Sequence, residues 1–146
     1  MTLERRLEWA ESIITRGAQL AGLDEAKGAC RLLSQAGKVL RHLGARSSPV
    51  PLRDELACAR ALEAAESVTA PGAFRLDCDE DLEYEAAFIA RGSLVSAMDL
   101  IFADRMRNPD AGTLHIRLGL APAGNDALLR LDCGIPGKNP VIIPLE

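Results

Sequence analysis

Residues 44–51 read GARSSPVP and interrupt an otherwise helical pattern. Each proline disfavours helical backbone at the residue before it, so a helix that reaches this stretch must end. Pro51 is also a good residue for the first turn of a new helix, because it lacks the N–H that would be unpaired there. We therefore place a boundary in this stretch and expect two units, residues 1–46 and residues 47–146.

The part before the boundary is predicted to be a pair of helices. Apolar or small residues recur every three or four positions along two segments, which is the spacing of one helix face. The first segment has Leu3, Leu7, Ala10, Ile14, Gly17 and Ala21, and the second has Cys30, Leu33, Ala36, Leu40 and Leu43. Gly22 ends the first helix and Asp24 caps the second, so the turn between them is short. The two helices are therefore expected to form an antiparallel hairpin.

The part after the boundary mixes helical and alternating patterns. Helices are expected at residues 51–68 and 92–106, and strands at 74–78, 113–121 and 127–133, with one more short strand within 140–146. In the first strand Phe74, Leu76 and Cys78 alternate with charged residues, which is the period of a half-buried strand. Turn-forming residues occupy 108–112 (NPDAG) and 122–126 (PAGND). The predicted fold class is α+β, a helical hairpin followed by a small α/β sandwich with helices on one face of the sheet.

Composition and charge exclude several classes of protein. The chain has 146 residues, 48% of them hydrophobic and 26% charged, which is typical of a folded domain and not of a disordered segment. A net charge of −4 gives no general attraction to nucleic acids or anionic membranes. No apolar stretch approaches the roughly 18 residues of a membrane span. Cys30, Cys58, Cys78 and Cys133 form no CxxC pair, so we expect reduced thiols in a cytoplasmic protein with no nucleic-acid partner.

Motifs with a defined chemistry are scarce. The acidic run from Asp77 lacks the glycine and the final glutamate of a calcium loop, and residues 134–139 (GIPGKN) lack the spacing and the hydroxyl of a phosphate loop. His115 alternates with apolar residues and is expected on the exposed face of its strand. His42 is a weak catalytic candidate, because an imidazole can accept a phosphoryl group. The favoured interpretation of His42 is an exposed histidine stabilised by the dipole at its helix end.

Four stretches resemble the cytoplasmic transmitter of sensor histidine kinases of the LytS/YehU type, which include the alginate-regulator kinases. Residues 50–56 (VPLRDEL) are close to that family's VPLREEL segment, which opens the helix leading into its ATPase-like domain. Residues 33–48 are similar to the end of its second dimerisation helix. Residues 89–105 resemble its nucleotide-binding helix, and residues 112–134 the strand hairpin that follows. The resemblance implies dimerisation helices followed by a truncated ATPase-like domain of the GHKL (Bergerat) type.

The departures from the family pattern fall on its catalytic residues. Arg6 stands near the position of the phosphoacceptor histidine, and Leu100 at the position of the asparagine that directs the metal ion. The neighbouring glutamate of the family becomes Asp99, and a later histidine becomes Asp104. Asp132 keeps the acidic group that accepts the adenine amine in the family. The family's lid and second glycine box would follow residue 146. The resemblance therefore implies a fold that has lost its ATP chemistry.

The sequence thus favours a non-catalytic, kinase-like regulatory or protein-interaction module of two-component signalling, with no cofactor and no metal. The hairpin is expected to form a homodimer and to dock a response-regulator-type receiver domain. Small residues along the hairpin would permit close helix approach in a four-helix bundle: Ala10, Gly17, Ala29, Ala36 and Gly37. The alternative for the same residues is a purely intramolecular core, which gives a monomer.

Two other functions stay open at this point. One is a histidine phosphotransferase that uses His42. The other is a nucleotide-binding fragment of a longer sensor kinase, in which Asp99, Asp132 and Gly134 are the residues that contact ATP.

Overall fold

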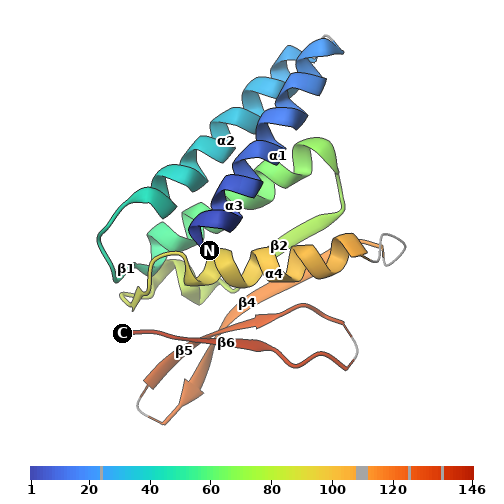
Figure 1. Ribbon diagram of the computed structural model, residues 1–146. Coiled ribbons are helices and arrows are strands. Elements are labelled where there is room, and N and C mark those ends of the chain that lie inside the picture. The colour runs from blue at the N-terminus through green and yellow to red at the C-terminus, as the bar shows by residue number, and fades with distance from the viewer. Residues whose placement is uncertain (24, 108–111, 125, 136) are drawn as a thin grey trace.

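The fold consists of a helical hairpin, two further helices and a four-stranded sheet, stacked as three layers (Figure 1). The computed structural model describes residues 1–23, 25–107, 112–124, 126–135 and 137–146. The helices are α1 (Leu3–Gly22), α2 (Ala26–Gly44), α3 (Leu52–Thr69), α4 (Ser93–Arg107) and the 3-10 helix η1 (Glu80–Tyr84). The strands are β1 (Val50–Pro51), β2 (Phe74–Cys78), β3 (Phe88–Ile89), β4 (Leu114–Ala123), β5 (Asp126–Asp132) and β6 (Val141–Pro144). The α+β class and the leading hairpin are as predicted.

The hairpin forms where the sequence places it, but its buried faces differ from the predicted ones. Trp9, Ile13 and Gly17 are the buried residues of α1, whereas Leu3, Leu7 and Ile14 of the predicted stripe are 70%, 63% and 65% exposed. In α2 the buried residues are Ala29, Leu32, Ala36, Val39 and Leu43, and Leu33 is half exposed. Each helix therefore carries two apolar faces about one residue out of phase, and most of the predicted stripe lies on the face that is left exposed. The predicted cap Asp24 lies outside the described residues.

The sheet follows the order β2-β4-β5-β6, with β2 parallel to β4 and the other pairs antiparallel. Helices α3 and α4 cover one face of it (Figure 1). Leu114, Ile116 and Leu118 of β4 are buried on that face, while His115 and Arg117 are exposed on the other, as the alternation predicts. Of the turn predicted at 108–112, the residues 108–111 lie outside the described ones.

The two parts of the chain share one hydrophobic core. Leu32 and Val39 of the hairpin belong to the same buried cluster as Leu62, Met98 and Ile116 of the sandwich. The boundary stretch itself contributes β1, whose Val50 pairs with Ile89 of β3 in a small antiparallel ribbon. The sequence does not predict this ribbon, because strands of two residues have no period to detect. GARSSPVP therefore redirects the chain without dividing its core.

Both edges of the four-stranded sheet are occupied by features that oppose further pairing. At the middle of edge strand β2, the Leu76 N–H donates to Glu63 Oε1 at 3.0 Å. At the other edge, β6 is four residues long and ends at Pro144, which has no N–H to offer. Among the described helices, none is long and apolar enough to cross a membrane.

The orientation of α1 predicts that two adjacent isoleucines contribute very different amounts to the free energy of unfolding. Ile13→Ala should lower the free energy of unfolding by about 3 kcal/mol, because it removes methyl groups from a buried site. Ile14→Ala should change it by less than about 0.5 kcal/mol. Urea unfolding in dilute solution, where self-association does not contribute, measures both. Equal losses would show that the buried face of α1 is assigned wrongly.

Candidate functional site

His42 lies near the carboxyl end of α2, and its surroundings differ from those expected. Its side chain is only 11% exposed, and its Nε2 atom lies 2.5 Å from Glu55 Oε2 in α3. The expectation of an exposed histidine is therefore wrong. The partner comes from 13 residues further along the chain, beyond the break at GARSSPVP. Nothing local in the sequence indicates this pair.

Glu55 is fully buried and connects three segments. Its Oε2 atom also accepts the Gly92 N–H at 3.0 Å, and its Oε1 atom accepts the Leu94 N–H at 3.1 Å. These two N–H groups belong to the start of α4, where the first turn of a helix leaves donors unpaired. A buried carboxylate is tolerable only when donors surround it, and the positive end of the α4 dipole adds to their effect. Glu55 thus caps α4 from a neighbouring helix.

Arg91 completes the group, which we call the Glu55 network: Glu55, His42, Arg91, Gly92 and Leu94. Arg91 Nη1 donates to the His42 carbonyl at 2.7 Å and lies 3.4 Å from His42 Nδ1. Its Nε atom donates to the Ser47 carbonyl at 2.6 Å. Arg91 therefore ties the end of α2 and the boundary stretch to the start of α4. Both ring nitrogens of His42 face protein groups, an arrangement that does not favour phosphoryl acceptance.

A cavity of about 250 Å³ adjoins His42 and is lined by Lys38, Asp54 and Cys58 as well. Burial, with a smaller contribution from the charge of Glu55, raises the pKa of the Cys58 thiol to about 12. The thiol is therefore protonated at neutral pH, and the thiol form is a poor nucleophile. The cavity holds polar groups but no activated nucleophile among them.

The structure places the nucleotide candidates Asp99 and Asp132 in different surroundings. Asp99 in α4 is buried and faces the hairpin, where Arg5 Nε donates to Oδ2 at 2.7 Å and Arg5 Nη2 to Oδ1 at 2.9 Å. The hydrogen bond to Asp99 raises the pKa of Arg5. Asp132 ends β5, half exposed, and its Oδ1 accepts the Gly134 N–H at 3.0 Å. Asp99 is thus committed to α1 and not directed toward Asp132 and Gly134.

The side of α4 that carries Leu100 forms a cavity of about 260 Å³ against the sheet. Leu100, 71% exposed, lines it together with Leu131 and Cys133. Its charged groups are Asp104 and Lys138, whose Oδ2 and Nζ atoms lie 2.5 Å apart. This contact lowers the pKa of Asp104 and raises that of Lys138. The pair neutralises itself and leaves little to balance a triphosphate.

Metal-ligating side chains do not gather in the described part of the chain. Its histidines, cysteines and carboxylates include no group of three that could hold a metal ion. The described residues therefore give no support for a metal-nucleotide site in this cavity.

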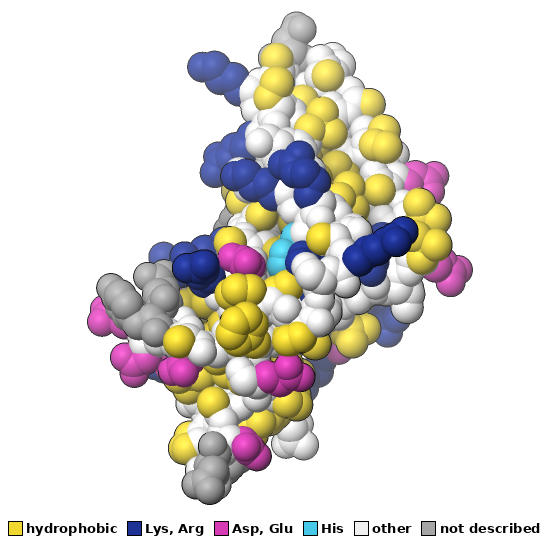
Figure 2. Space-filling view, turned by 90° about the vertical axis from the view of Figure 1, so that its left-hand side faces the viewer, with side chains coloured by type: hydrophobic (Ala, Val, Ile, Leu, Met, Phe, Trp, Pro, Cys, Tyr) yellow, Lys and Arg dark blue, Asp and Glu magenta, His cyan; other side chains and the backbone are white. Residues whose placement is uncertain are grey.

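The exposed apolar residues of the hairpin form a second candidate site, which we call the outer face: Leu3, Leu7, Ile14 and Leu33. The stripes of the two helices meet there, because a Cβ added at Gly17 of α1 would lie 3.5 Å from Leu33 of α2. Figure 2 shows hydrophobic side chains gathered along the upper half of the molecule, over the hairpin, beside a band of basic ones. The sequence identifies Leu3, Leu7, Ile14 and Leu33 as parts of helical stripes, and the structure leaves them exposed and not in the intramolecular core that was the alternative.

The Glu55 network predicts that even an isosteric change is destabilising. In Glu55→Gln, either orientation of the amide places its NH₂ group against a backbone N–H of Gly92 or Leu94. We expect the free energy of unfolding to fall by about 2–3 kcal/mol. Asp54→Asn changes the neighbouring carboxylate, which is 54% exposed, and should cost less than about 0.5 kcal/mol. Chemical denaturation compares the two, and a Gln variant as stable as the parent would contradict the role of Glu55.

Comparison with known proteins adds no further identification of the site. No protein-family model and no curated protein matches this chain.

Proposed function

We propose that this chain is a non-catalytic, kinase-like regulatory module that forms a homodimer through the outer face of its hairpin and docks a receiver-type signalling partner. The observation that carries the proposal is the outer face itself. Contiguous exposed apolar side chains are uncommon on a monomer and are typical of interaction surfaces. Here they lie along two antiparallel helices, which is the geometry of half of a four-helix bundle.

The charges that flank the outer face support a second copy as its occupant. The α2 segment, residues 26–46, has five basic residues and no acidic one, and four of the basic residues follow one exposed stripe: Lys27, Arg31, Lys38 and Arg41. The amino-terminal half of α1 instead exposes Glu4, Glu8 and Glu11. The basic band is visible in Figure 2. The two edges of the outer face therefore have opposite charge.

A two-fold axis parallel to the helices makes these edges complementary. In such a bundle α1 of one copy lies beside α2 of the other, at the same height as within one hairpin. Glu8 and Glu11 then lie level with Lys38 and Arg41 of the second copy, because α1 and α2 run in opposite directions. Small residues such as Gly37 on the same side permit close approach of the helices.

Several features support a role without catalysis. Arg6 and Leu100 stand where the resembling kinases have their phosphoacceptor and metal-directing residues. Arg6 Nε donates to the Met1 carbonyl at 3.2 Å, so it serves the start of α1. Docking of a receiver domain rests on the resemblance of the hairpin to the family's dimerisation helices.

Dimerisation is tested by charge placed in the outer face. Light scattering at tens of micromolar should give the mass of a dimer for the parent chain and of a monomer for Leu7→Glu/Ile14→Glu, because two buried carboxylates oppose association. Ile142→Glu places the same charge on an exposed apolar residue of β6 and should leave the dimer intact. A parent chain that is monomeric at this concentration would overturn the homodimer.

The arrangement of the two copies is tested by light scattering on charge-reversal variants. Lys38→Glu/Arg41→Glu and Glu4→Lys/Glu11→Lys should each weaken the homodimer, because each places like charges at the contacting edges. An equimolar mixture of the two variants should restore it. If the mixture fails to associate, the two-fold axis parallel to the helices is contradicted. Whether the outer face is the dimer contact is decided separately, by the Leu7→Glu/Ile14→Glu variant.

The proposed loss of kinase chemistry predicts the result of a nucleotide titration. Isothermal titration of ATP with magnesium into the parent chain should give no heat of binding, since the cavity beside Leu100 holds an apolar wall and one neutralised ion pair. Titration of ATP without magnesium serves as the comparison. Micromolar affinity in either titration would favour the nucleotide-binding alternative.

A further inference from the structure

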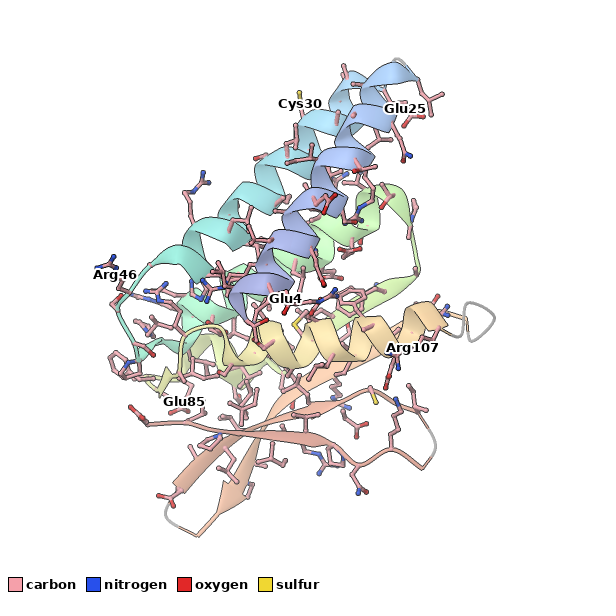
Figure 3. All side chains as sticks on the ribbon, viewed as in Figure 1. Glu4, Glu25, Cys30, Arg46, Glu85 and Arg107 are labelled. Carbon is pink, nitrogen blue, oxygen red and sulfur yellow. The ribbon has the colours of Figure 1, made fainter. Side chains whose placement is uncertain are left out.

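A cleft of about 350 Å³ lies where α1, α3 and α4 meet. Its α1 wall consists of Arg5, Trp9, Ser12 and Arg16, which lie on the side of the helix opposite to the outer face, and of Glu8 at the edge of that side. Figure 3 shows side chains from the three helices converging in this region, near the labelled Glu4. The volume is within the range of about 300–1,000 Å³ that small-molecule sites occupy.

The base of the cleft is apolar and aromatic. Trp9 and Leu62 are buried, and Phe102 of α4 is half buried beside them. Trp9 is fixed in place, since its Nε1 atom donates to Glu66 Oε1 at 3.1 Å. Such a base accepts a flat apolar group and does not need to rearrange for it.

The carboxylates around the cleft already have partners. Asp99 accepts two hydrogen bonds from Arg5. Glu66 accepts from Arg16 Nη1 at 3.1 Å and Nη2 at 3.2 Å, in addition to Trp9. Their acceptor capacity is therefore largely used, and a ligand cation would have to displace an arginine.

The donors of the cleft, in contrast, are not all used. Arg16 Nε is buried and has no acceptor among the residues that the structure describes. The Ser12 hydroxyl, one helical turn away on α1, is exposed to solvent at the cleft and forms no hydrogen bond within the described part of the chain. A buried N–H without an acceptor is costly, so a small turn of the Arg16 side chain that brings Nε to a ligand oxygen in the cleft would be stabilising.

The charge balance decides which kind of oxygen fits. The cleft has two positive groups, Arg5 and Arg16, and three negative ones, Glu8, Glu66 and Asp99, which gives a net charge of −1. A ligand anion would meet this excess of negative charge, whereas a neutral carbonyl oxygen would not. We propose that the cleft binds a small uncharged molecule with a flat apolar body and a carbonyl or amide oxygen that accepts from Arg16 Nε and Ser12. This site does not include the apolar residues of the outer face, and it shares only Glu8 with the proposed dimer contact.

The chain carries its own reporter for this site, because Trp9 is its single tryptophan. Three probes of similar shape differ only in charge: phenylacetamide is neutral, phenylacetate is an anion and phenethylammonium is a cation. Each is titrated into the full chain while Trp9 fluorescence and the indole N–H resonance are followed. Phenylacetamide should shift both signals with saturation in the millimolar range, and the two charged probes should bind at least about tenfold more weakly.

Matched variants locate the binding. Ser12→Leu fills the cleft and should abolish the response, whereas Thr15→Leu makes a similar change at an exposed position of α1 that does not line the cleft. Arg16→Lys keeps the charge but removes the Nε donor, and should lower the affinity for phenylacetamide at least about fivefold. Circular dichroism establishes that each variant is folded.

The proposal is overturned by any of three results: no saturable response to phenylacetamide, tighter binding of phenylacetate, or an undiminished response in folded Ser12→Leu.

Discussion

The buried carboxylate of Glu55 is the constraint on which the arrangement of the molecule depends. A charge without access to water must be met by donors, and here the donors come from α2 through His42 and from the start of α4 through Gly92 and Leu94. The angle between hairpin and sandwich is therefore set by a hydrogen-bond geometry as well as by packing. Arg91 secures the same junction from the outside through the His42 and Ser47 carbonyls.

This junction also explains why a glycine stands at position 92. Gly92 has a φ of +80°, and a Cβ there would lie 3.1 Å from Leu43 at the end of α2. Any other residue would be strained in its backbone and would press on the hairpin. The N–H of Gly92 can reach Glu55 only because the chain turns in this way before α4.

The order of the main elements could be predicted from the sequence because each long element has a period of its own. The helices and strands begin and end within a few residues of the predicted positions, and β4 buries Leu114 and Ile116 as expected. The orientation of the hairpin helices could not be predicted. Both have two apolar faces, and only the contacts with α3 and α4 determine which of them is covered.

The contacts of the candidate site were harder to predict from the sequence, for a related reason. His42 is a candidate because its imidazole can accept a phosphoryl group. Its partners Glu55 and Arg91, however, are 13 and 49 residues away along the chain. Asp99 and Leu100 are adjacent in sequence and face different parts of the molecule, one the hairpin and the other a cavity against the sheet. Spacing in a sequence places residues on an element, whereas contacts between elements decide what they do.

The protected edges of the sheet limit the ways in which copies of this chain can associate. The Glu63 side chain on the Leu76 N–H and the proline at the end of β6 leave no regular backbone ladder on which a further strand could align. The association that we propose uses side chains on the helices instead. A contact between helical faces related by a two-fold axis closes on itself, so a high local concentration would yield discrete assemblies and not growing fibres.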